Sequence, residues 1–334
     1  MNNLHAIITG VGGYVPDYVL TNEELSQMVD TSDEWIMTRI GVKERRVLNK
    51  EGLGSGYLGK KAVHNLLDKT GIDPDTVEGL ICATCSPDYQ FPSNATQIVE
   101  DAKMKNAFAY DLGAACCGFM YAMDTAASLI ESGRYKRLVV VGAEKTTSFV
   151  DYTDRSTCPI FGDGAGAVLV EATEEDLGWQ DSILRTDGSG FKYLHLPAGG
   201  SVNPASHYTV DHKMHYIHQE GRTVFKYAVN NMSHLTAELC ERNHLNNDNI
   251  DWIIPHQANI RIIQAVAHSL DLPPEKVMIT IHKYGNASAA CIPLVMWDME
   301  DKFKKGDNIV LTAFGAGFVF GSAYLKWGYD PVRK

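Results

Sequence analysis

Cys116 is the residue of this sequence best placed for covalent chemistry. It lies between Asp111 and Gly118, where an apolar, strand-like run ends at small residues and a helical pattern begins. The helix is expected to bury one apolar stripe and to end at Gly133. The residues of that stripe are Phe119, Met123, Ala126 and Ile130. Because free N–H groups and the positive end of a helix dipole favour a thiolate, the pattern predicts a nucleophilic cysteine at a helix N-terminus.

His256 and Asn286 have side chains that could assist such a thiol. His256 follows an expected buried strand, Ile253-Ile254-Pro255, and stands before a helical pattern. A helix N-terminus disfavours an imidazolium, so we expect a neutral histidine that donates a hydrogen bond. Asn286 follows Gly285 in a turn-like dipeptide and does not titrate. Two neutral donors suit the stabilisation of a thioester or enolate oxygen.

An internal repeat relates the segments that carry these residues. Apolar and glycine positions recur at a constant offset of 173 residues. The pairs are Ile72 and Leu245, Val77 and Ile250, Ile81 and Ile254, Gly133 and Gly306, and Gly142 and Gly315. The repeat predicts two copies of one α/β unit, which we assign to residues 1–175, carrying the cysteine, and 176–334, carrying the histidine and asparagine.

The same offset makes a prediction about the site. Cys116 corresponds to Ala289, at the end of the loop that contains Asn286, and Ala83 corresponds to His256. Ligands of open α/β sheets collect at the carboxyl ends of strands, so a pseudo-twofold arrangement would bring these junctions together.

Length and composition describe an ordinary globular protein. The chain has 334 residues, 45% hydrophobic and 21% charged, enough for about two domains of roughly 150 residues each. The net charge of -11 gives no support to nucleic-acid binding. Seven cysteines without a signal-peptide pattern favour reduced thiols, and no apolar run is long enough to span a bilayer. We therefore expect a cytoplasmic protein.

Other cysteines and histidines are expected to be structural. Cys82 and Cys85 lack a second pair for a zinc site, so we interpret both as core, and Cys117 as packing. The evenly spaced histidines near Asp211 favour a polar loop or strand over a metal site, and we expect no bound metal. They are His212, His215 and His218. Residues 196–206 read as a long loop that could cover a pocket.

Many ordered motifs resemble those of β-ketoacyl-acyl-carrier-protein synthase III, a condensing enzyme of the thiolase fold. The resemblance runs nearly end to end. Its motifs are Thr31-Ser32-Asp33-Glu34-Trp35-Ile36 with Arg39, Phe91-Pro92-Ser93, Ala114-Ala115-Cys116, Asp154-Arg155, Phe161-Gly162-Asp163-Gly164-Ala165-Gly166, Pro255-His256-Gln257-Ala258-Asn259, Gly285-Asn286 and Phe314-Gly315-Ala316-Gly317-Phe318.

The resemblance implies a duplicated, five-layer α-β-α-β-α fold and a two-stage acyl transfer. Cys116 would take a short acyl group from acyl-coenzyme A. Malonyl-acyl-carrier protein would then lose CO2 to give an enolate, stabilised by His256 and Asn286, that attacks the thioester and yields a 3-oxoacyl product. The backbone N–H groups of Cys116 and Ala316 would hold the oxyanion. No cofactor is expected, because acyl-coenzyme A is a substrate.

The resemblance also implies binding residues and a homodimer. The coenzyme A contacts would be Thr31, Trp35, Arg39, Arg155, Gly221, Phe225, Ala258 and Asn259. The carrier-protein segment would be Gln257, Ala258, Asn259, Ile260 and Arg261, with help from Lys226 and Arg222. Phe91 would enter the acyl pocket of a partner subunit, and Phe161 would line the pocket of its own chain.

Two departures from the family pattern and one alternative remain open. Cys117 stands where many relatives carry alanine, and Ala316 replaces a common glycine while keeping a backbone N–H. The alternative function is a secondary-metabolite condensing enzyme of polyketide or quinolone type with the same Cys-His-Asn set.

Overall fold

Two β-sheets form the frame of the protein. A computed structural model describes residues 4–331. The first sheet has the order β1-β7-β6-β4-β5 and the second the order β11-β12-β13-β8. The strands of the first sheet are β1 (His5–Tyr14), β4 (Gly79–Ala83), β5 (Phe108–Leu112), β6 (Arg137–Lys145) and β7 (Asp163–Thr173). Those of the second are β8 (Gly178–Thr186), β11 (Trp252–Pro255), β12 (Asn308–Gly315) and β13 (Val319–Lys326).

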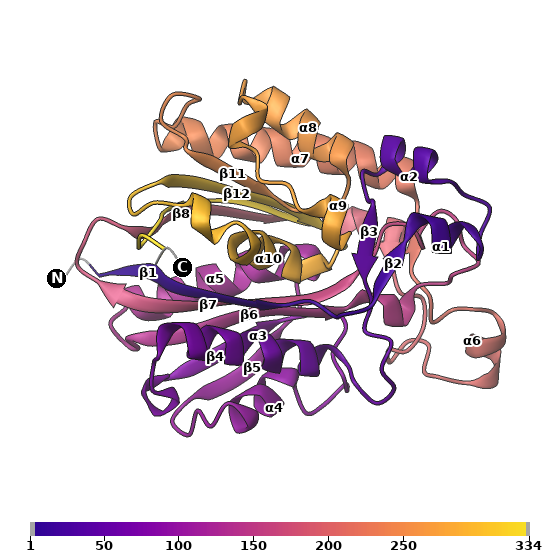
Figure 1. Ribbon diagram of the computed structural model, residues 1–334, viewed down its shortest axis with the longest axis horizontal. Helices are drawn as coiled ribbons and strands as arrows, with labels where there is room; N and C mark the ends of the chain where they lie inside the picture. Colours follow the sequence, from indigo (N-terminus) through magenta and orange to yellow (C-terminus); the bar gives the residue numbers. More distant parts are fainter. Residues whose placement is uncertain (1–3, 332–334) are drawn as a thin grey trace.

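Helices cover both outer faces and fill the space between the sheets (Figure 1). The outer pair on the first sheet is α3 (Ser55–Thr70) and α4 (Asn94–Asp101), and that on the second is α7 (Gly221–Arg242) and α8 (Ile260–Ser269). The central layer consists of α5 (Gly118–Glu131) and α10 (Cys291–Asp298). The five-layer α-β-α-β-α fold that the family resemblance implied is confirmed.

The central helix α5 contacts strands of both sheets, which explains its composition. Its expected apolar stripe, Phe119, Met123, Ala126 and Ile130, is fully or almost fully buried. Met120, Ala122 and Ala127 on other sides of the helix are buried as well. A helix between two sheets buries more than one face, so apolar residues extend beyond a single stripe, and only a few polar positions such as Ser128 and Glu131 are exposed.

The offset of 173 residues recurs in the boundaries of the elements. β4 begins at Gly79 and β11 at Trp252, and α5 begins at Gly118 and α10 at Cys291. Each central helix is preceded by a 3-10 turn, η2 (Ala115–Cys117) or η6 (Ser288–Ala290). The first residue of each turn has a positive φ that is rare outside glycine, 44° at Ala115 and 46° at Ser288.

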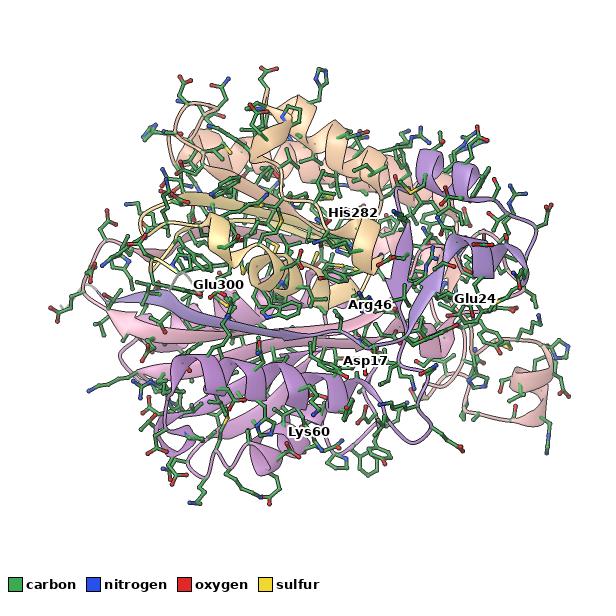
Figure 2. The ribbon with its side chains drawn as sticks, in the orientation of Figure 1. Asp17, Glu24, Arg46, Lys60, His282 and Glu300 are labelled. Carbon is green, nitrogen blue, oxygen red and sulfur yellow. The ribbon has the colours of Figure 1, made fainter. Side chains whose placement is uncertain are left out.

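Smaller elements gather at one end of the sheets, on the right in Figure 1. They include β2 (Val19–Thr21), α1 (Asn22–Ser26), α2 (Asp33–Arg39), β3 (Glu44–Arg46), β9 (Leu194–His195), α6 (His207–Asp211), β10 (His218–Gln219) and α9 (Ile281–Tyr284). Figure 2 shows Glu24 and Arg46 in this region. Lys60 lies on α3, in the outer layer of helices that covers the first sheet. Within residues 4–331, no helix combines the length and apolar character that a membrane crossing requires.

Close packing at η2 and η6 leaves no room for side chains at certain glycines. A Cβ at Gly142 on β6 would lie 2.5 Å from the carbonyl oxygen of Ala289, and one at Gly315 would lie 2.8 Å from the Cys116 nitrogen. Both distances are shorter than real Cβ contacts, so these glycines permit the two turns to approach the strands.

We therefore expect Gly142→Ala to destabilise the protein by about 1–3 kcal/mol, because the added methyl overpacks against backbone. Equilibrium denaturation measures the change. Gly188→Ala is the control: its Cβ would meet no atom within 4 Å, and we expect a change within about 0.5 kcal/mol. Equal stability of the two variants would contradict the packing argument.

Candidate active site

The cavity at the sheet ends contains all the residues expected to do chemistry. It has a volume of about 680 Å³, and Cys116, His256, Asn286 and Ala316 all line it. Cys116 belongs to the first half of the chain and the other three to the second. The structure thus brings together residues that lie up to 200 positions apart in the sequence.

Cys116 lies in η2, between the end of β5 and the start of α5. Burial raises the pKa of its thiol to about 12, and the charge of Glu144 acts in the same direction. Hydrogen bonds from the Ser288 hydroxyl and from its own backbone amide oppose this increase. The sequence led us to expect a readily ionised thiol. In the free enzyme, burial outweighs these hydrogen bonds, because a thiolate loses more solvation than they replace.

His256 follows β11 and is almost completely buried. Its backbone N–H donates to the carbonyl of Thr312 on β12 at 2.8 Å, which fixes the residue against the second sheet. Among the described residues its buried Nδ1 has no hydrogen-bond partner. Burial lowers the pKa of the imidazole to about 4. His256 is therefore neutral near pH 7, as the sequence predicts.

Asn286 is oriented by its neighbours in the loop between α9 and η6. Its Oδ1 accepts the backbone N–H of Ser288 at 2.8 Å. Its backbone N–H donates to Ile160 at 2.9 Å, and its carbonyl accepts from Gly162 at 3.1 Å. With Oδ1 engaged and the residue on the cavity wall, the side-chain NH2 is the group available to donate into the cavity.

The mouth of the cavity combines aromatic and cationic side chains. Trp35, Arg39, Phe225 and Arg261 line it, together with Gly221, Ala258 and Asn259. The guanidinium of Arg261 lies 5.2 Å from the centre of the Phe225 ring. Two expected contacts, Thr31 and Arg155, are not on the wall itself. Arg155 stacks on Trp35 with 4.6 Å between guanidinium and ring centre, and pairs with Asp30 at 3.7 Å.

One residue of the expected carrier-protein segment has a side chain that lies in the core. Gln257 is only 1% exposed. Its Nε2 donates to the carbonyl of Pro255, and its Oε1 accepts the N–H groups of Thr280 and Ile281. Gln257 therefore ties β11 to the segment before α9 and has no surface for a partner. Its place in the carrier-protein segment was implied by the family resemblance alone.

The rest of that segment divides between core and surface. Ile260 is half-buried and packs beside Gly41, where a Cβ would come within 2.5 Å of it. Arg261 is exposed, as are Gln264 and His268 on the same face of α8. Lys226 and Arg222 on α7 are also exposed, and Arg222 lies at the mouth of the cavity.

The two expected acyl-pocket residues lie in different environments. Phe161 is buried and lines the cavity. Phe91 is 86% exposed and lies away from the cavity wall of its own chain. Leu196 at the start of the expected loop also lines the cavity, so part of that loop borders the pocket.

Two residues that line the cavity were not predicted from the sequence to do so. Cys85 was interpreted as core, but it is exposed to the cavity, and its thiol lies 3.3 Å from the Ser288 hydroxyl. Cys82 and Cys117 are buried as expected. Ser288 also lines the cavity. The 173-residue offset could have identified Ser288, because it pairs this residue with Ala115, which stands next to the predicted nucleophile.

Comparison with known proteins gives concordant results. Residues 110–188 match the family model for 3-oxoacyl-[acyl-carrier-protein] synthase III, and residues 240–327 match the model for its C-terminal part. The β-ketoacyl-[acyl-carrier-protein] synthase III of Phocaeicola vulgatus is 64% identical over the full length of both chains. A synthase III of Bacteroides thetaiotaomicron is 63% identical, also over both full lengths.

Solved structures show the same likeness. The crystal structure of 3-oxoacyl-[acyl-carrier-protein] synthase III from Aquifex aeolicus is 41% identical with a TM-score of 0.88, covering 96% of this chain and 100% of that one. The corresponding Pseudomonas aeruginosa structure is 35% identical with a TM-score of 0.90, covering 98% and 100%.

The buried, neutral His256 gives the stability of the protein a defined dependence on pH. Its pKa is lower in the folded chain, about 4, than its ordinary value of 6.5, so the unfolded chain binds the extra proton first. Stability is therefore complete above about pH 6.5 and falls as the pH drops towards 4. The loss is on the order of 3 kcal/mol, at 1.36 kcal/mol per pKa unit. Denaturation at several pH values should show a weaker loss in His256→Gln, and an identical loss would contradict this assignment.

Proposed function

This chain belongs to the 3-oxoacyl-[acyl-carrier-protein] synthase III family, and from that premise we propose that it catalyses the initiating condensation of type II fatty acid biosynthesis. It is an acyltransferase that joins an acyl group from a short acyl-coenzyme A to a two-carbon unit from malonyl-acyl-carrier protein. The products are 3-oxoacyl-acyl-carrier protein, coenzyme A and CO2. The observation that carries this proposal is the meeting of Cys116 with two neutral donors, His256 and Asn286, on one cavity wall.

In the first stage, the Cys116 thiolate attacks the carbonyl carbon of the acyl-coenzyme A thioester. The tetrahedral oxyanion is held by the backbone N–H groups of Cys116 and Ala316, which stand at η2 and at the end of β12. Collapse of this intermediate expels coenzyme A and leaves an acyl group on Sγ. The placement of Gly315, with no space for a Cβ beside the Cys116 nitrogen, supports a shared role for these two backbone segments.

In the second stage, His256 and Asn286 donate hydrogen bonds to the thioester oxygen of the malonyl group. Loss of CO2 leaves an electron pair that forms an enolate at this oxygen, and neutral donors stabilise it without protonating its carbon. The carbon then attacks the carbonyl carbon of the Cys116 thioester and forms the new C–C bond, and the C–S bond breaks to release the Cys116 thiolate. A pKa of about 4 keeps His256 in the required neutral form.

The surface at the cavity mouth fits two anionic substrates. Trp35 and Arg155 offer an aromatic and a planar cationic face to the adenine of coenzyme A, and Arg39 lies at the mouth. Arg222, Lys226 and Arg261 form an exposed basic group beside it that suits an acidic carrier protein. These three side chains form a local basic patch on a chain whose net charge is -11.

A homodimer in the cytoplasm completes the proposal. Phe91, among the most exposed large apolar side chains described, is suited to be covered by a partner subunit. The strand β5 forms one edge of the first sheet, with Tyr110 partly exposed.

The division of the chain at residue 175 into two halves also remains a prediction.

The alternative of a secondary-metabolite condensing enzyme has weaker support. The priming β-ketosynthase of the R1128 polyketide pathway is 28% identical with a TM-score of 0.89. The fold is thus shared, but the curated synthases III are more than twice as similar in sequence. Analysis of the product formed with malonyl-acyl-carrier protein and with malonyl-coenzyme A distinguishes the two functions.

Intact-mass spectrometry tests the division of labour in the site. With acyl-coenzyme A, the wild-type protein should gain one acyl group, located on Cys116 by peptide mapping, and Cys116→Ala should gain none. His256→Ala and Asn286→Ala should still be acylated but lose malonyl decarboxylation by about 100-fold or more. Equal acylation of Cys116→Ala, or full condensation by the other two variants, would refute the assigned roles.

Steady-state kinetics tests the stacked pair at the mouth. Arg155→Ala should raise KM for acyl-coenzyme A about 5- to 10-fold with little change in kcat, because it removes a stacking face that does not touch the reacting atoms. Arg134→Ala is a matched control, since Arg134 lies over Tyr135 at 5.5 Å and outside the cavity wall. A fall in kcat without a change in KM would contradict a binding role.

A further inference from the structure

One completely buried guanidinium has no role in the mechanism above. Arg45 is the middle residue of β3, and its side chain is 0% exposed. Its hydrogen-bond acceptors within residues 4–331 are neutral oxygens, and none of them is a carboxylate. Burial lowers the pKa of Arg45 to about 10, so the side chain keeps its charge at neutral pH. A buried charge without a paired carboxylate costs free energy unless its hydrogen bonds compensate, so the contacts of Arg45 are informative.

The acceptors of Arg45 belong to two separate segments of the chain. Nη1 donates to the carbonyl of Leu20 at 2.9 Å, and Nη2 donates to Oδ1 of Asn22 at 2.8 Å. Leu20 and Asn22 belong to β2 and α1, which lie beside β3 (Figure 1). Nη2 also donates to the carbonyl of Pro159 at 3.1 Å, in the loop that follows η3 (Thr146–Phe149). One side chain therefore joins the N-terminal elements to a loop 114 positions away.

Asn22 connects Arg45 to α2. Its side chain is 2% exposed. Nδ2 donates to Oδ1 of Asp33 at 2.8 Å and to the carbonyl of Val42 at 2.8 Å, while Oδ1 accepts from Arg45. Asp33 is the first residue of α2, the helix that carries Trp35. The start of α2 is thus linked to the guanidinium through a single buried amide.

Pro159 connects Arg45 to the loop that carries Arg155. Within this loop, the backbone N–H of Thr157 donates to the carbonyl of Asp154 at 3.3 Å. The hydroxyl of Thr157 donates to the Asp154 carboxylate at 2.6 Å. Arg155 therefore lies in a turn that is closed by its own hydrogen bonds, and Arg45 holds the chain directly after that turn.

The two connections meet again at the mouth of the cavity. Trp35 from α2 and Arg155 from the loop stack with 4.6 Å between guanidinium and ring centre. We propose that Arg45 is a positioning residue that sets the spacing of Trp35 and Arg155 and thereby prepares the site for acyl-coenzyme A. Arg45 is not on the cavity wall, so it acts through these neighbours. The inference rests on the proposed role of the stacked pair in coenzyme A binding.

The reacting groups are held by bonds that do not involve Arg45. Oδ1 of Asn286 accepts the backbone N–H of Ser288, and the backbone N–H of His256 donates to the carbonyl of Thr312. Loss of the Arg45 hydrogen bonds should therefore weaken the binding of acyl-coenzyme A without slowing the chemical steps. In steady-state kinetics, this is a higher KM with little change in kcat.

A double-mutant cycle with Arg45→Lys and Arg155→Ala tests the proposal. Lysine keeps the charge and the aliphatic stem, but its compact ammonium lacks the planar fork that reaches both segments. Arg45→Lys should raise KM for acyl-coenzyme A about 3- to 10-fold, with kcat within about twofold of wild type. In the Arg155→Ala background the same substitution should have little further effect, because the stack that Arg45 positions is already lost.

Asp33→Ala interrupts the connection at the surface and leaves the buried guanidinium in place. Asp33 is exposed, and we expect its loss to raise KM about threefold. Glu34→Ala is the matched control, since Glu34 is an exposed carboxylate of the same helical turn with no hydrogen bond or ion pair in the described part of the chain. Each variant removes one negative charge, which by itself would favour an anionic substrate. Glu34→Ala should therefore leave KM unchanged or slightly lower.

The possible results separate the positioning role from the function itself. Additive effects of Arg45→Lys and Arg155→Ala on KM overturn the positioning role, and so does a fall in kcat at unchanged KM. If Arg45→Lys does not fold, equal KM values for Asp33→Ala and Glu34→Ala overturn it. If acyl-coenzyme A leaves wild-type Cys116 unlabelled, the proposed function is wrong. The dissociation constant of coenzyme A, measured by calorimetry in the same variants, then still decides the positioning role.

Discussion

The contact between the turns η2 and η6 is the constraint on which the rest of the site depends. η2 leads from β5 into α5, and η6 leads from the loop of Asn286 into α10. Glycines at 142 and 315 let η6 and η2 pack closely against β6 and β12. This contact sets the position of Cys116 relative to Ser288 and Asn286. The first residue of each turn, Ala115 or Ser288, has a positive φ, an uncommon conformation that persists only where the surrounding structure holds it.

Burial acts on all three ionisable groups of the site, with different consequences. It keeps His256 neutral, which makes it a hydrogen-bond donor, and it favours the thiol form of Cys116. It also raises the basicity of Glu144. A cavity of low dielectric constant thereby disfavours a permanently charged nucleophile, which would be open to side reactions. It favours a charge only where fixed hydrogen-bond donors can stabilise that charge.

The features that could be predicted from the sequence are those that depend on local residue patterns and on the internal repeat. The small-residue junction at Cys116 marked a strand-to-helix turn, and the 173-residue offset related it to the loop of Asn286 and to the strand end of His256. Exposure was harder to predict, because it depends on what distant segments cover. The resemblance placed Gln257 in a partner-binding segment, but four backbone partners enclose its side chain, and Cys85 was interpreted as core although it lines the cavity. Glu144 gave no local signal, since its donors come from two segments far from it in the sequence, residues 84–86 and Ala289.

The two turns show how unequal the halves of one chain have become. Position 289 in η6 corresponds to Cys116 in η2, and its backbone N–H donates to the buried side chain of Glu144 at 3.3 Å. The corresponding N–H at Cys116 is the one expected to meet a transient anion of the substrate. Identical subunits related by symmetry would have to carry the same residue at both places. Joining two copies in a single polypeptide releases them from that requirement, so one copy can evolve as the reacting surface while the other becomes its fixed electrostatic support.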